Sequence, residues 1–129
     1  MDDDEQLVAK AIGILVRVAT DFADDKDTGL VTYGKLYHEL GNIDHITGER
    51  VLGKVNDVLR ALGVSTMLTS LVIKDAKDAN ESPMPAGGYF KYAKQHKLMK
   101  EGDDEKTFWI MQTNKISSAI EKAYLLPDD

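Results

Sequence analysis

Four cationic residues in the middle of the chain are the best placed to do chemistry. Arg50 and Lys54 are four residues apart, so they would share one face of a helix, and Lys74 and Lys77 follow a hydrophobic segment. Arginine and lysine bind phosphate groups with charge-assisted hydrogen bonds. The spacing therefore predicts contacts with a nucleic-acid backbone.

Residues for catalysis are lacking in the sequence. The chain has no cysteine, which excludes a thiol nucleophile and a Cys-ligated metal, and its histidines, His38, His45 and His96, are far apart. The glycine-rich phosphate loops, the HExxH zinc motif and the GxSxG nucleophile motif are also absent. The acidic run 21–27 does not have the spacing of a calcium loop. We therefore expect a non-enzymatic protein without catalytic residues, a metal or a cofactor.

Composition sets limits on fold and partners. With 129 residues, of which 43% are hydrophobic and 29% charged, the chain fits a single domain over residues 1–129. Its net charge of −6 argues against wrapping nucleic acid with the whole surface, although Lys91, Lys94, Lys97 and Lys100 form a basic stretch. Apolar runs are short and the first residues are acidic, so we expect no membrane segment and a cytoplasmic location.

Hydrophobic spacing predicts the elements that must position these cations. Apolar residues recur every three or four positions over 5–23, 33–40, 49–62, 89–99 and 105–125, which indicates five helices. The β-branched, apolar segment 66–74 is typical of a strand, and 75–88, with two prolines and a Gly-Gly pair, should be a loop. The expected fold is mostly α (α+β), a winged-helix-like core with about five helices and a small β-sheet.

The two middle helices have the order of a helix-turn-helix. A short helix over 33–40 is followed by a longer one over 49–62, with Arg50 near its start, and such a second helix enters the major groove of DNA. The loop 75–88 would be the wing, with Lys74 and Lys77 near the phosphates, although Asp75, Asp78 and Glu81 oppose that role. The other interpretation is the exposed face of an ordinary three-helix core.

Several short motifs in this region resemble a known DNA-binding lobe. The residues Thr32-Tyr33-Gly34-Lys35-Leu36, Arg50-Val51-Leu52-Gly53 and Leu71-Val72-Ile73 resemble the winged-helix lobe of alkylguanine alkyltransferases and alkyltransferase-like proteins. The resemblance implies that Arg50 stabilises a base extruded from the duplex and that Tyr33 belongs to the nucleic-acid interface. The family's Pro-Cys-His-Arg segment has no counterpart, so alkyl transfer is excluded.

A second resemblance covers most of residues 31–124. The Tyr-Gly-x-Leu start, the Leu-Val-Ile segment, the Gly88-Tyr89-Phe90 stretch and the acidic turn before Phe108-Trp109 are similar to a domain of uncharacterised bacterial and mobile-element proteins. That resemblance implies a fold and no particular activity.

Two functions follow from these patterns, and an enzyme of a class without a recognised motif is a third alternative. The first is a non-enzymatic DNA-binding module that uses Tyr33, Arg50, Lys54, Lys74 and Lys77. The alternative is an acidic protein-interaction module, an inhibitor or adaptor from a mobile element, with a basic protein partner or a second copy of the chain as its partner. A cationic face free of carboxylates would favour DNA, whereas interruption by Glu49, Asp57, Asp75 and Asp78 would favour the protein partner.

Overall fold

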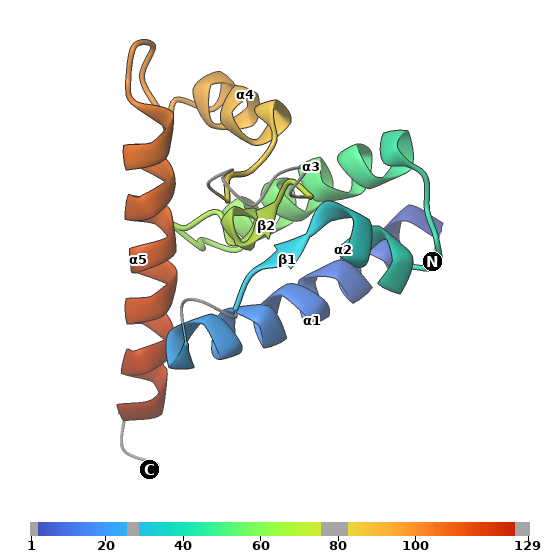
Figure 1. Ribbon diagram of the computed structural model, residues 1–129, viewed down its shortest axis with the longest axis horizontal. Helices are drawn as coiled ribbons and strands as arrows, with labels where there is room; N and C mark the ends of the chain where they lie inside the picture. The colour runs from blue at the N-terminus through green and yellow to red at the C-terminus, as the bar shows by residue number, and fades with distance from the viewer. Residues whose placement is uncertain (1–2, 26–28, 76–82, 126–129) are drawn as a thin grey trace.

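Two long amphipathic helices frame the molecule. The computed structural model describes residues 3–25, 29–75 and 83–125. Helix α1 (Asp3–Asp24) contacts both α3 and α5 (Glu105–Leu125), and α5 stands across the end of α1 (Figure 1). Val8, Ala11 and Leu15 bury the inner face of α1. The helices predicted over 5–23 and 105–125 are thereby confirmed.

Side-chain caps define the starts of the two middle helices. Helix α2 (Tyr33–Glu39) begins after Thr32, whose hydroxyl accepts the Lys35 amide at 3.2 Å. Helix α3 (His45–Ala61) begins after Asp44, whose carboxylate accepts the Thr47 amide at 2.7 Å. Such caps satisfy amides that have no partner inside the helix. The predicted start of this helix at Glu49 was therefore wrong, because the Asp44 cap extends it by one turn.

The predicted strand over 66–74 was also wrong in most of its length. Leu68–Leu71 form a 3-10 helix, η1, and only Val72–Ile73 form a strand, β2. Strand β2 pairs in parallel with β1 (Val31–Thr32), which precedes α2. Buried apolar residues suit a 3-10 turn in the core as well as a strand, so the composition of this segment did not distinguish them. In the described residues β2 pairs with β1, the strand before α2. The wing expected in the loop 75–88 stays a prediction.

The segment after β2 leads into a further helix, α4. Helix α4 spans Gly87–Gln95, so it begins and ends earlier than the predicted helix over 89–99. Residues 83–86 have no regular structure, in agreement with the predicted loop. Residues 76–82, with Lys77, Asp78 and Glu81, lie outside the described residues.

Hydrophobic residues gather in adjoining clusters rather than in one layer. The largest joins α1 to α2 and α3 around Leu15, Leu36 and Val55. A second joins α4 to the start of α5 around the buried residues Phe90 and Trp109. In the described part of the chain, five α-helices and a two-stranded sheet confirm a mostly α fold of the α+β class. None of its helices has the length and apolar character needed to cross a membrane.

Candidate functional site

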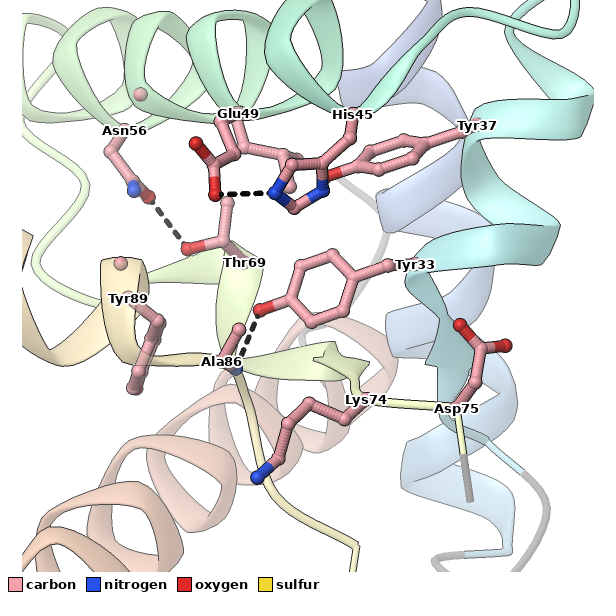
Figure 2. Close-up of a pocket in the computed structure, with 13 residues that line it drawn as sticks. Tyr33, Tyr37, His45, Glu49, Asn56, Thr69, Lys74, Asp75, Ala86 and Tyr89 are labelled. Carbon is pink, nitrogen blue, oxygen red and sulfur yellow. Dashed lines mark hydrogen bonds and ion pairs between the residues drawn. The ribbon is translucent and has the colours of Figure 1, made fainter. Parts of the chain in front are cut away.

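A pocket of about 530 Å³ lies between α2, α3, β2 and the start of α4 (Figure 2). Its walls include three tyrosines, Tyr33 and Tyr37 from α2 and Tyr89 from α4. Pockets of a few hundred cubic ångströms with aromatic walls are typical of sites for small ligands. This pocket is therefore the principal candidate site in the described part of the molecule.

Two polar pairs fix the inner surface of the pocket. The buried Asn56 accepts a hydrogen bond from the Thr69 hydroxyl at 2.9 Å, which joins α3 to η1. The Tyr33 hydroxyl oxygen accepts the Ala86 amide at 2.9 Å, so its own proton can be donated elsewhere. An amide and a hydroxyl whose partners hold them in place can recognise both donors and acceptors on a ligand.

The three tyrosines are protonated at neutral pH. Burial raises the pKa values of Tyr33, Tyr37 and Tyr89, because a phenolate loses the stabilisation that water gives to its charge. Their rings form part of the pocket wall, and the Tyr33 hydroxyl can offer a neutral hydrogen bond, whereas the Tyr89 hydroxyl is paired with the buried Ser70 hydroxyl at 2.5 Å. These side chains are therefore suited to binding and poorly suited to nucleophilic attack.

A glycine in the middle of α3 forms part of the pocket wall. Apart from its own stretch of helix, Gly53 has no protein atom within 4 Å of the place where its Cβ would lie. Glycine inside a helix is about 0.5–1 kcal/mol less favourable than alanine. Since the protein's own packing does not require this glycine, it leaves space for a ligand to approach the helix backbone.

Gly48, on the same helix, must be a glycine for a structural reason. A Cβ there would overlap the ring of Tyr37. We expect Gly48→Ala to lower the free energy of unfolding by about 1–3 kcal/mol, the usual cost of overpacking a core, because Tyr37 must move. Urea denaturation followed by circular dichroism measures this change, and unchanged or increased stability would contradict the packing described here.

The pocket edge carries charges of both signs. His45 and Glu49 are one helical turn apart, with 3.0 Å between His45 Nε2 and Glu49 Oε1, and both side chains are largely exposed. Lys74 and Asp75 lie at the end of β2. The Asp75 carboxylate accepts the Gly34 amide at 3.3 Å, so it is partly engaged with the start of α2.

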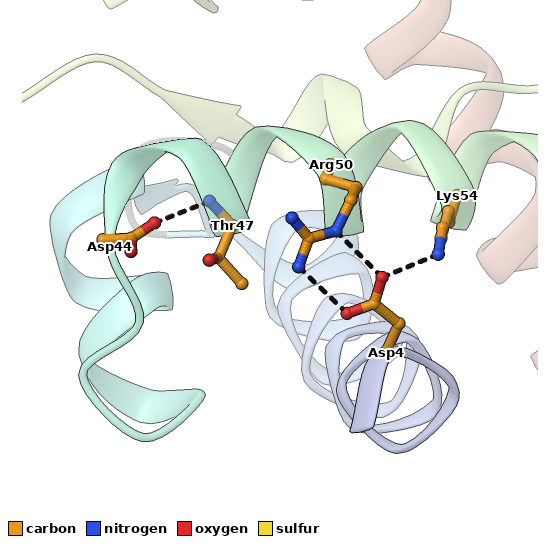
Figure 3. Close-up of polar contacts among 5 residues, drawn as sticks. All are labelled: Asp4, Asp44, Thr47, Arg50 and Lys54. Atoms are coloured by element: carbon orange, nitrogen blue, oxygen red, sulfur yellow. Dashed lines mark hydrogen bonds and ion pairs between the residues drawn. The ribbon is translucent and has the colours of Figure 1, made fainter. Parts of the chain in front are cut away.

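Arg50 and Lys54 lie away from this pocket and point toward α1 (Figure 3). Arg50 donates two hydrogen bonds to the Asp4 carboxylate, at 2.9 and 3.1 Å, and Lys54 donates one at 2.6 Å. These donors hold the pKa of Asp4 well below its usual range. The two leading cations are therefore already paired within the chain.

The predicted contact residues thus divide into two places. Tyr33 and Lys74 belong to the pocket, whereas Arg50 and Lys54 belong to the contact with α1. Arg50 also lies in the second turn of α3 rather than at its head, because the helix begins at His45. Among the described residues, the predicted cations do not form one face free of carboxylates, and Lys77 lies outside those residues.

Sequence reasoning missed the residues that build the pocket and the one that pairs the cations. Tyr37, Asn56 and Thr69 come together from α2, α3 and η1. Asp4 is 46 residues before Arg50, and an acid at a helix start is equally well explained by the helix dipole. A glycine within an otherwise apolar helical pattern, Gly53, was the one local signal available.

No family model, curated protein or solved structure matches this chain. The resemblance to the alkyltransferase-like lobe therefore remains a prediction from the motifs. Within the described residues, no three acidic or histidine side chains are grouped as ligands for a metal ion.

Proposed function

We propose that the protein is a non-enzymatic nucleic-acid-binding module that accepts one unpaired base in the pocket between α2, α3 and α4. The observation that carries the proposal is the combination of aromatic walls, a buried amide and an unobstructed Gly53 in one pocket. All three lie beside α3, the second helix of the predicted helix-turn-helix.

The chemistry of the pocket suits a planar heterocycle. Unpaired bases are recognised by stacking on aromatic side chains and by hydrogen bonds to their edges. Here Tyr33, Tyr37 and Tyr89 supply aromatic surface, and Asn56 carries both a donor and an acceptor on its amide. A pocket of about 530 Å³ is in the range that small ligands occupy.

Charge supplies a smaller part of this interaction. Lys74 is exposed at the pocket edge, but Glu49 and Asp75 stand at the same edge, and the whole chain carries a net charge of −6. A stacked base contributes about 1–3 kcal/mol regardless of its sequence. Stacking therefore outweighs the phosphate contacts, and an unpaired base should be preferred over a fully paired duplex.

We propose that the module binds nucleic acid without catalysing a reaction. The Thr69 hydroxyl donates to Asn56 rather than to a base that would activate it. His45 and Glu49 form an exposed pair on one helix, which explains their proximity without a catalytic role.

The proposal predicts a preference that fluorescence anisotropy can measure. We expect a short labelled single strand, and a duplex with one unpaired base, to bind at least about fivefold more tightly than the fully paired duplex, because each stacked base contributes about 1–3 kcal/mol. The matched control is the same duplex with the unpaired base removed. Equal binding of all three DNAs would overturn the base pocket, and no binding at low salt would overturn the function.

A second function is favoured by the pairing of the cations. Because Asp4 pairs with both Arg50 and Lys54, it compensates one of their two positive charges within a chain whose net charge is already −6. An acidic surface steers association with a basic protein. A basic partner is therefore the candidate to pursue by pull-down if the protein binds no nucleic acid.

A further inference from the structure

Arg50 and Lys54 converge on a single carboxylate. Arg50 uses Nε and Nη2 to contact both oxygens of Asp4, and Lys54 contacts one of the same oxygens (Figure 3). The Asp4 side chain is 20% exposed, whereas those of Arg50 and Lys54 remain 49% and 48% exposed. The cations are thus accessible from solvent while Asp4 fills the space between them.

The same donors would fit a phosphate group. The guanidinium fork binds carboxylates and phosphates in the same two-point geometry, and a lysine adds a point charge that either anion can use. Asp4 therefore occupies an arrangement of donors that a backbone phosphate would also satisfy. The cationic pair predicted from the sequence is present, but an internal anion fills it.

The position of Asp4 makes this contact displaceable. It lies in the first turn of α1, and the buried residues that fasten α1 to the core begin one turn later, at Val8. Helix ends open with much smaller free energies than helix centres. Releasing Asp4 from Arg50 and Lys54 therefore requires the loss of one helical turn and leaves the core packed.

We infer that Asp4 is an internal competitor that occupies a phosphate-binding site formed by Arg50 and Lys54, and that it lowers the affinity of the protein for nucleic acid. This inference rests on the proposed function, since the ligand that competes with Asp4 is a backbone phosphate. The site lies on the α1 side of α3, whereas the base pocket lies on the side of α2 and α4.

Asp4→Asn tests the competition, with Asp3→Asn as its matched control. Both changes remove one negative charge from the same helical turn, but Asp3 is exposed and takes no part in the contact with Arg50 and Lys54. Anisotropy with a labelled single strand should show roughly threefold to tenfold tighter binding by Asp4→Asn than by Asp3→Asn. This is the range expected when two exposed ion pairs no longer compete with the phosphate for Arg50 and Lys54. The slope of log K against log salt should steepen by up to about 1.4, because two cations become available.

Adding Arg50→Gln to Asp4→Asn should remove the gain, and thermal unfolding of each variant verifies that the fold is retained. If Asp4→Asn and Asp3→Asn bind alike while the wild-type protein binds, the competition is wrong and the proposed function stands. If no variant binds at low salt, both fail. If Asp4→Asn binds and the wild-type protein does not, both are supported.

Discussion

Replacing Gly53 with leucine is expected to weaken binding of a single strand at least about fivefold without loss of stability. The leucine side chain would project from the pocket wall into space where, apart from the neighbouring part of α3, no protein atom lies within 4 Å of the Cβ position. Exclusion of one stacked base removes about 1–3 kcal/mol of binding free energy. Removal of a glycine from the helix interior adds roughly 0.5–1 kcal/mol to the free energy of unfolding.

A matched control for this prediction exists on α1. Gly13 is also helical, exposed and without an atom near its Cβ position, but it is not part of the pocket wall. Gly13→Leu should give the same gain in stability and no loss of affinity. Anisotropy and urea denaturation of both variants measure the two effects, and equal affinities for Gly53→Leu and Gly13→Leu would show that the pocket does not receive the ligand.

Trp109→Ala is expected to lower the free energy of unfolding by about 3–5 kcal/mol, the usual range for removing a large buried aromatic residue. The indole packs in the cluster that includes Tyr89, and its Nε1 donates to the Ser70 carbonyl at 2.7 Å. This hydrogen bond fastens α5 to η1 beneath the pocket. Urea denaturation followed by circular dichroism measures the loss without needing the tryptophan itself.

Two further variants separate packing from hydrogen bonding at this position. Trp109→Phe keeps much of the buried surface but removes the donor to Ser70, so its loss should be about 1–3 kcal/mol. Ile110, the next residue, is 42% exposed, and Ile110→Ala should change stability by no more than about 0.5 kcal/mol. A loss below about 1 kcal/mol for Trp109→Ala would contradict the anchoring role.

The long helices could be predicted from the sequence because their patterns are local. Over 5–23 and 105–125 the apolar residues repeat at helical spacing, and α1 and α5 form there. The Thr32 cap is a local feature of the same kind, since its partner, Lys35, is only three residues away. Predictions of this kind depend on neighbours in the chain rather than on the fold.

The remaining features depend on residues distant in the chain. Gly48 precedes the predicted helix over 49–62, yet it belongs to α3, and the Tyr37 ring occupies the place where its Cβ would lie. The segment before Val72 suggested a strand, yet only the two residues opposite Val31 and Thr32 find a partner. The pocket and the Asp4 contact likewise join segments whose proximity follows from the packing of the helices.

The short parallel sheet has a consequence for how the protein folds. Its two strands enclose α2, α3 and η1 in sequence, and the adjoining Gly34 and Asp75 are 41 residues apart. Contacts between distant residues form slowly because the intervening chain must first be closed into a loop. We expect α2 and α3 to form early and the pairing of Val31 with Val72 to form late. Amide hydrogen exchange should then show that this strand pairing and the adjoining pocket open together as one cooperative unit.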